Sequence, residues 1–517
     1  MVWRSKLFLP LPLAVLVGAI ALLLELLNDA GALSQRALFY ALTLLVLVYL
    51  GFEVRRLRLV HPDRWLLNPV VLCSIFTFVL GYGVTNVLFW LPEEELELVG
   101  LVPEVTPAMV TLMWLVLVGA VAMWLGYWSR FAARLGNQVA VHRFKRRFLP
   151  HSDALRSLAL PGLFVVSLIA RLAQIQLGVF GYSSNYDQLI KFGSVTQYLS
   201  LASGLGKLAL ALAALQFFSR KASPAAMSWF YVLLVVEVLF GFLSGFKSSV
   251  VMPFVIVAFC QYLQTGRFSK SLIILVLVGL SVAYVVIEPF RAALNENATF
   301  RDNSLNSIAS TMIGVSGITS VDTTEQASRL LFIASRFNLS YIGSFGIEYA
   351  DSHSSLPYGS PDFLGDLFLA PLHAWIPRVI WDTKPLGNLG LWYNQVVMGM
   401  SHFSSTAMGP FTYLYFAGGF TAVFLGFFLI GILQRSLFFL LQPAYSVAGA
   451  TVFLAMLGSI VLIDSSFNGI IITLCRELPL LLILQFLLFR RSLQGRAFNN
   501  IRCKPPVFGN THAKDSV

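Results

Sequence analysis

The stretch FTYLYFAGGFTAVFLGFFLIGILQ, residues 411–434, contains no charged side chain. About 20 apolar residues in an α-helix cross the hydrocarbon core of a bilayer, so this stretch predicts a membrane-spanning helix. The whole chain shares its character, because 57% of the 517 residues are hydrophobic, only 12% are charged and the mean hydropathy is +0.76. Such a composition excludes an ordinary soluble globular protein and indicates a polytopic membrane protein.

Eleven further runs are apolar and long enough to span, and they lie near residues 8–27, 37–53, 66–91, 107–129, 158–177, 195–218, 227–245, 248–265, 271–290, 444–463 and 469–489. The first run follows Arg4 and Lys6, as the apolar core of a signal peptide would. It is longer than a typical core of that kind, and Glu25 interrupts its end. We therefore expect a retained first helix and an all-α fold with about 12 transmembrane helices.

Lysine and arginine are distributed unequally between the two sides that twelve crossings define. With a cytoplasmic N-terminus, 24 of the 36 basic residues fall in cytoplasmic segments, nine fall outside and three fall within spans. The positive-inside rule therefore predicts a multi-pass protein with both termini in the cytoplasm. This topology also accounts for the formal net charge of +11, so we expect no nucleic-acid partner.

The predicted topology divides the chain into five parts: helices 1–4 in residues 1–157, helices 5–9 in residues 158–290, a large outer loop in residues 291–409, helices 10–12 in residues 410–490, and a cytoplasmic tail in residues 491–517. A connection as long as the outer loop is uncommon unless it is functional. Within it, residues 326–350 have helical periodicity. Residues 363–376 are apolar but too short to span, and Pro377 ends them, so we expect a re-entrant or interfacial segment that returns the chain to the membrane surface at Arg378.

No motif in the sequence predicts a metal or an organic cofactor. Four cysteines are too few for a disulfide scaffold, and they are not spaced as zinc ligands. Asp362 and Asp366 are four residues apart and could chelate a divalent ion, but two aspartates alone are weak evidence. No glycine-rich nucleotide motif is present, which argues against a site for ATP or a nucleotide sugar.

Several cationic side chains are predicted on the outer side of the membrane. A charge within a membrane is unfavourable by about 2.5–3.5 kcal/mol on insertion scales, so it usually faces a partner or a wet cavity. A single arginine at a helix end more often reaches the lipid headgroups. Together, however, these residues favour a cationic outer cavity: Arg171, Lys247, Arg291, Arg329, Arg336, Arg378 and Lys384. Lys207 and Glu237 lie near the middle of their spans and are interpreted as an ion pair between helices.

A cationic cavity at membrane level suits a diphosphate carried on a polyprenyl lipid. Arginine binds phosphate oxygens through two parallel hydrogen bonds. When a hydroxyl attacks the sugar carbon that carries the diphosphate, fixed cationic groups can stabilise the charge on the departing diphosphate without a metal. Tyr358 and Trp381 are candidate platforms for sugar rings, although interfacial aromatic belts are the commoner explanation for such residues.

His353 is the preferred candidate for the base that activates an acceptor hydroxyl. Glu348 and Asp351 lie nearby in the sequence, and carboxylates raise the proton affinity of imidazole. An exposed loop histidine without a catalytic role explains the same pattern equally well. His373 and His402 are the other histidine candidates in the loop.

The stretch IPRVIWDTKP, residues 376–385, resembles the signature of Wzy-type oligosaccharide repeat unit polymerases, which are relatives of the O-antigen polymerases and ligases. The resemblance covers about residues 170–432, and its further motifs are GVFGY at 178–182, GFK at 245–247, Tyr358-Gly359, SSTAMGP at 404–410, Tyr415 and Gly418-Gly419. The family more often has an arginine at the position of Lys247. A lysine acts on phosphate as a point charge, so bidentate binding is not expected there.

The resemblance implies a metal-independent membrane glycosyltransferase of GT-C-like architecture. It would polymerise undecaprenyl diphosphate-linked oligosaccharide repeat units at the periplasmic face of a bacterial inner membrane, in the biosynthesis of surface polysaccharide or O-antigen. The essential arginines of the family map to Arg378, Arg336 and Arg291. The expected partners are the lipid-linked oligosaccharide and membrane lipid, with chain-length regulator and flippase proteins as candidates.

Two alternatives to a polymerase follow from the same features. One is an O-antigen ligase-like glycan transferase, which would move a finished glycan to another acceptor. The other is a transporter or flippase of lipid-linked glycans. A transporter would be expected to contain inverted repeats and helix breaks at mid-bilayer rather than one dominant outer loop.

Overall fold

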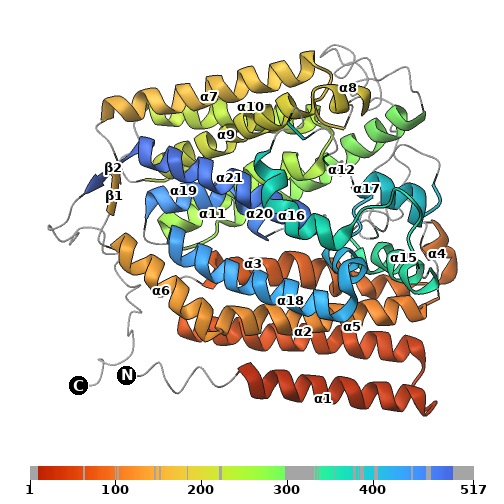
Figure 1. Ribbon diagram of the computed structural model, residues 1–517. Helices are drawn as coiled ribbons and strands as arrows, with labels where there is room; N and C mark the ends of the chain where they lie inside the picture. The colour runs from red at the N-terminus through yellow and green to blue at the C-terminus, as the bar shows by residue number, and fades with distance from the viewer. Residues whose placement is uncertain are drawn as a thin grey trace, which may run out of the picture.

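The computed structural model describes residues 10–61, 65–98, 101, 104–144, 147–150, 153–182, 184, 186–219, 224–296, 331, 335, 337–353, 355–376, 380–381, 384, 389–400, 406–443, 446–461 and 467–492. Most of these residues are helical, and Figure 1 shows the long helices running side by side as one bundle. Within the described ranges, eleven helices are long and apolar enough to cross a membrane. The chain is therefore an α-helical, multi-pass membrane protein.

The N-terminal part of the bundle contains α1 (Pro10–Asp29), α2 (Gln35–Val60), η1 (Trp65–Leu67), α3 (Pro69–Cys73), η2 (Ser74–Gly81), η3 (Val84–Trp90), α4 (Glu93–Leu98), α5 (Pro107–Trp128) and α6 (Arg130–Phe144). Thr106 and Pro107 start α5 in the usual way: the threonine side chain accepts a hydrogen bond from Met109 N, and proline occupies the first turn. The predicted third span is one continuous apolar segment, but it changes from α-helix through π-helix to 3₁₀-helix.

The middle of the chain forms α7 (Asp153–Gln176), α8 (Tyr186–Lys191), α9 (Gly193–Phe217), α10 (Pro224–Leu243), α11 (Lys247–Thr265) and α12 (Lys270–Glu296). Helix α9 packs against α7, α10 and α11, which makes it the central helix of this group. Its second half is buried on every side, from Leu205 through Leu215 apart from Lys207.

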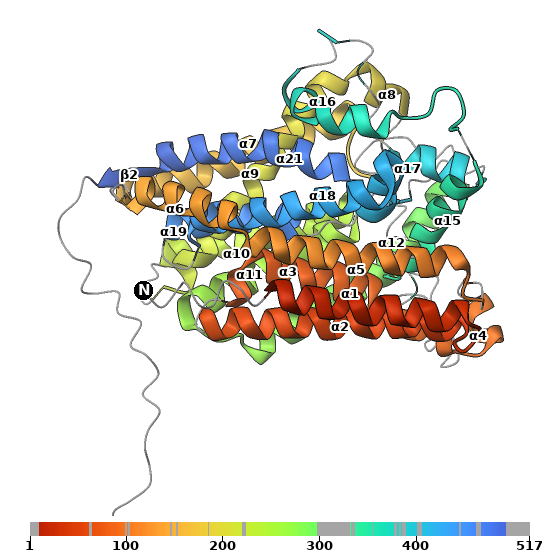
Figure 2. The same cartoon turned by 60° about the horizontal axis from the view of Figure 1, so that its bottom comes forward.

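The predicted outer loop contributes α15 (Leu339–Ser352), α16 (Phe363–Trp375), α17 (Leu389–Trp392) and η5 (Tyr393–Val397). Helix α16 confirms the short helix expected there, and Ile376 is its C-cap. These elements are not a separate lobe. Helix α15 packs on α5 and α18, while α16 packs on α21 and α18. In Figure 2, α16 lies along the top of the bundle, above α21 and α18, and Gln197 near the start of α9 donates a hydrogen bond to Ala374 O at 2.7 Å.

The C-terminal part contains α18 (Pro410–Leu441), α19 (Val447–Ala455), α20 (Leu457–Val461) and α21 (Phe467–Leu488). Helices α18 and α5 pack closely together. A Cβ at Gly126 or at Gly431 would collide with the backbone of the facing helix, so glycine allows this approach. A two-stranded antiparallel sheet of β1 (Arg147–Pro150) and β2 (Phe489–Ser492) joins the two halves of the chain.

The expected span at 444–463 is not one continuous helix in the described residues. The run divides into α19 and α20 at Met456, and neither part is long enough to span alone. Seven consecutive residues of α19, from Ala448 to Leu454, are buried inside the protein. An apolar run of this length belongs to a core helix as readily as to a membrane span, and here burial by neighbouring helices explains its hydropathy.

The two ends of the bundle differ in what they carry. Helices α4, α8, α15 and α17 lie at one end, which we call the loop end, and β1 and β2 lie at the other, which we call the tail end (Figure 1). Helix α11 starts at the loop end and α9 also runs from the loop end toward the tail end. Residues near the starts of α9, α11 and α21 therefore share one half of the bundle.

Candidate functional site

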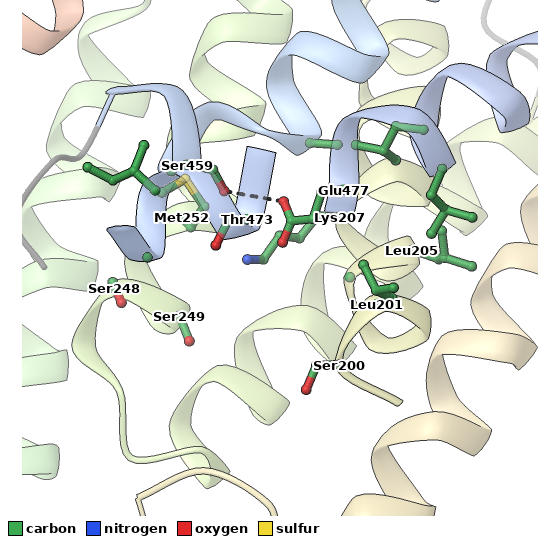
Figure 3. A pocket seen from close by; sticks show the side chains of 17 residues that line it. Ser200, Leu201, Leu205, Lys207, Ser248, Ser249, Met252, Ser459, Thr473 and Glu477 are labelled. Carbon is green, nitrogen blue, oxygen red and sulfur yellow. Dashed lines mark hydrogen bonds between the residues drawn. The ribbon is translucent and has the colours of Figure 1, made fainter. Parts of the chain in front are cut away.

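A cavity of about 290 Å³ lies inside the bundle between α9, α11, α20 and α21. Figure 3 shows its lining, in which hydroxyl groups from all four helices surround two charged side chains. The hydroxyl groups belong to Ser200, Ser248, Ser249, Ser459 and Thr473. Glycines at 204, 458 and 469 leave the space open, and leucines close the remaining walls. A polar cavity between apolar helices is a strong functional-site candidate.

Lys207 on α9 and Glu477 on α21 are the two charged residues of the cavity. The Ser459 hydroxyl donates a hydrogen bond of 3.2 Å to Glu477 Oε2. The positive charge of Lys207, and after it that of Arg476 on the same helix as the glutamate, favours the ionised form of Glu477. Charged side chains within a membrane are usually retained where they face a partner or a wet cavity, and Lys207 and Glu477 line the same cavity.

The N-terminus of α11 forms one side of the cavity. Ser248 and Ser249, in its first turn, line the space, and Lys247 precedes them at the first helical position. The N-cap residue is Phe246, whose side chain has no group that could cap the helix. A helix N-terminus carries a partial positive charge and favours an anion nearby. The structure thus places Lys247 beside the cavity wall.

Arg291 joins two turns next to that wall. Its Nε donates a hydrogen bond of 2.9 Å to Gly245 O, and its guanidinium lies 4.5 Å from the centre of the Tyr182 ring. Tyr182 N in turn donates to Ser244 O at 2.8 Å. The motifs at 178–182 and 245–247 are therefore packed together, and Arg291 holds them. Gly181 has a φ of 65° and lies against the Ser244 backbone, which requires glycine there.

Arg171 has a buried partner. Its Nη2 lies 2.7 Å from Glu237 Oε1 and 2.8 Å from Oε2, and it also donates to Ser203 O at 3.3 Å. The predicted pair between Lys207 and Glu237 is thus wrong, because Glu237 pairs with Arg171 and Lys207 faces the cavity. Which residues meet depends on helix packing that depth in the membrane alone does not determine.

Lys384 closes the C-terminus of α16. Its ammonium donates to His373 O at 2.6 Å and to Ile376 O at 2.9 Å, which satisfies carbonyls of the last turn. The Trp381 ring lies 4.9 Å from the ring of His373. His373 is 4% exposed, and its pKa is lowered by burial first and by the charge of Lys384 second. Lys384 and Trp381 thus form one structural cluster with His373.

Helix α16 begins with Asp362 as its N-cap, and this side chain accepts a hydrogen bond of 3.0 Å from Gly365 N. Asp366, one turn later, is buried. Burial first and the charge of Asp362 second raise the pKa of Asp366. Within the described ranges, no group of three or more His, Cys, Asp or Glu residues could hold a metal ion.

His353 and Tyr358 lie on the surface of the loop end. The His353 ring stacks on Tyr349 at 4.1 Å, and its Nδ1 lies 3.0 Å from Tyr349 O. Its neighbour Asp351 accepts a hydrogen bond of 2.7 Å from Tyr415 on α18. Tyr358 is fully exposed. None of these side chains lines the cavity.

Four predicted residues, Arg329, Arg336, Arg378 and His402, lie outside the described residues. The most informative residue that sequence reasoning missed is Glu477. The sequence alone could have indicated Glu477, because an acidic side chain in the middle of an apolar run is unfavourable in a membrane and usually faces a partner or a wet cavity. Its proximity to Lys207 could not be predicted from the sequence. The two residues are 270 positions apart and are brought to one cavity only by the packing of α9 and α21.

Comparison with known proteins gives one match. The family described as "Domain of unknown function (DUF8712)" matches residues 164–492, which is more than half of the chain and includes the cavity, the Arg291 turns and all of the loop elements. No curated protein and no solved structure matches the chain. The chain therefore belongs to the DUF8712 family.

Proposed function

We propose that this protein is a membrane glycosyltransferase that polymerises undecaprenyl diphosphate-linked oligosaccharide repeat units. A growing glycan leaves its lipid diphosphate and is joined to the terminal sugar of a new lipid-linked unit. The loop end faces the periplasm, the membrane is the bacterial inner membrane, and the architecture is GT-C-like. The resemblance of residues 376–385 to the Wzy-type signature supports this activity.

The observation that carries the proposal is the polar cavity between α9, α11, α20 and α21. At about 290 Å³ it is at the small end of ligand sites, so it suits one sugar ring or one diphosphate rather than a whole repeat unit. Its hydroxyl lining and its two charged side chains suit a polar group, whereas the apolar helices around it suit a polyprenyl tail.

Each cationic residue then has a distinct place in the proposal. Arg336 and Arg378 in the loop bind the diphosphate, as the family resemblance implies, with Lys247 adding charge at the start of α11. Arg291 fixes the turn that carries Lys247. Arg171 stabilises the packing of α7 on α10 through Glu237, and Lys384 stabilises α16. In this proposal, only some of the cationic residues contact phosphate, and the others stabilise the structure around the site.

Transfer is tested directly with purified protein in liposomes. The probe is the undecaprenyl diphosphate-linked oligosaccharide that accumulates in cells lacking this protein. Each glycosidic bond should release one undecaprenyl diphosphate, measured by chromatography of the lipid fraction, and chelation of divalent ions should leave the rate unchanged. A protein that binds the probe but releases no undecaprenyl diphosphate would contradict the proposal.

A second candidate, a transporter of lipid-linked glycans, is favoured by one observation. Helix α18 is interrupted at Gly418 and Gly419, whose backbone angles are not helical, and interrupted helices are typical of transporters. The liposome experiment separates the two functions. Movement of intact probe across the bilayer without release of undecaprenyl diphosphate would support the transporter.

A further inference from the structure

Glu477 is one of the two charged residues that line the cavity. Its Oε2 is held by the Ser459 hydroxyl at 3.2 Å, whereas its Oε1 makes no hydrogen bond with the described part of the chain. The carboxylate of Glu477 points into the cavity (Figure 3). One oxygen is thus oriented by the protein, and the other is left for a ligand.

Lys207 also lines the cavity. Among the described residues, no hydrogen bond or ion pair engages its ammonium, although its charge acts on Glu477. The two groups therefore share the cavity without direct ion pairing. Cationic side chains lie in or near the cavity: Lys207 in its lining, Lys247 at the start of α11, and Arg476 next to Glu477 on α21.

We propose that Glu477 is the general base that deprotonates the acceptor hydroxyl, and that the positive charge of Lys207 favours the ionised form of its carboxylate. This inference rests on the proposed glycosyl transfer and names a catalytic residue for it. The hydroxyl proton passes to Glu477 as the hydroxyl oxygen bonds to the anomeric carbon of the donor sugar. The bond between that carbon and the diphosphate oxygen breaks, the diphosphate leaves with the electron pair, and Glu477 later releases the proton to water.

The loop carboxylates and histidines are less suited to this role. His353 is exposed and stacked on Tyr349, and Asp351 is engaged by Tyr415, so both belong to the surface of the loop end. Glu477 instead faces a cavity between apolar helices, where an ionised carboxylate acts more strongly than it does in water.

The first test replaces Glu477 with glutamine, which keeps the shape and removes the base. A general base contributes typically about 10²–10⁴-fold, so E477Q should lose at least about 100-fold in turnover while binding of undecaprenyl diphosphate stays within about twofold. Glu94→Gln, an exposed carboxylate change on α4, is the matched control and should keep full turnover. E477Q turnover within tenfold of wild type, or a loss of binding together with turnover, would overturn the role of Glu477.

The second test uses the pH profile of turnover, which a merely structural role would not move. Lys207→Met removes the positive charge that favours ionised Glu477, so the pH of half-maximal turnover on the acid side should rise, whereas Lys207→Arg should restore it. An unchanged pH of half-maximal turnover on the acid side in Lys207→Met would contradict the proposed effect of Lys207 on Glu477. If wild-type protein releases undecaprenyl diphosphate but E477Q and Lys207→Met do not behave as predicted, the proposed transfer is retained and the assignment of Glu477 as the base is rejected. If wild type releases none, the proposed transfer itself fails.

Discussion

The buried pair of Arg171 and Glu237 connects α7 with α10. Removing one partner of a buried ion pair leaves an uncompensated charge and typically costs about 3–5 kcal/mol. Glu237→Gln should therefore lower the thermal unfolding temperature of the detergent-purified protein markedly. The double variant R171M/E237M should recover most of the loss, because it leaves no lone charge. A double variant as unstable as the sum of both single variants would contradict this account, and Glu94→Gln is the neutral control.

His373 makes stability depend on pH. Burial and Lys384 lower its pKa in the folded protein, so the unfolded chain binds a proton first as the pH falls. The stability that neutral His373 provides is complete above its ordinary pKa of about 6.5 and is lost as the pH falls toward its lower folded value. Thermal unfolding between pH 8 and pH 5 should show a smaller acid-side loss in His373→Gln than in wild type. Equal losses would contradict the prediction.

Sequence reasoning at the scale of single residues identified costly charges better than their partners. The position of Arg171 in an apolar run predicted that it needs a partner or a wet cavity, and Glu237 is that partner. Lys207 was predicted to pair with Glu237 because both lie near mid-span. Lys207 instead shares the cavity with Glu477, which lies on the last helix, α21. Pairing between distant helices depends on rotation about each helix axis, which apolar runs do not define.

Helix α18 contains a break that only glycine permits. Gly419 has φ 61° and ψ −149°, a region that other residues avoid at a cost of about 1–3 kcal/mol. Gly419→Ala should therefore lower the unfolding temperature and, if the break shapes the loop end, the rate of transfer. Gly51→Ala in α2 is the matched control, because its Cβ meets no atom within 4 Å and its φ is ordinary. Equal stability of the two variants would contradict the need for the break.

Whole elements were largely predictable, because hydrophobic length and proline are local signals. Eleven of the expected spans correspond to helices in the described residues, and α16 ends at Trp375, just before Pro377. The division between α19 and α20 was not predictable, since burial by protein and burial by lipid produce the same apolar run. The pairing of β1 with β2 depends on residues 147–150 and 489–492, which are too far apart for a local pattern.

The orientation of the whole molecule follows from the proposed topology and can be measured in cells. In a variant without native cysteines, Tyr358→Cys is placed on the exposed loop end, and Arg267→Cys is placed on the turn between α11 and α12. A membrane-impermeant maleimide should label Tyr358→Cys from the periplasm of cells with a permeabilised outer membrane, but should label Arg267→Cys only after the inner membrane is opened. The reverse pattern would contradict a periplasmic loop end.

In the whole molecule, a polar cavity lies between α9, α11, α20 and α21, and α16 of the predicted outer loop packs on α21. The proposed activity is repeated glycosyl transfer, and its most direct measurement is the chain-length distribution of the product. Purified protein in liposomes, supplied with undecaprenyl diphosphate-linked oligosaccharide, should give a ladder spaced by one repeat unit on a gel, and E477Q should give none. A single transfer product would indicate a ligase. Unchanged oligosaccharide in the presence of bound wild-type protein would contradict the claim.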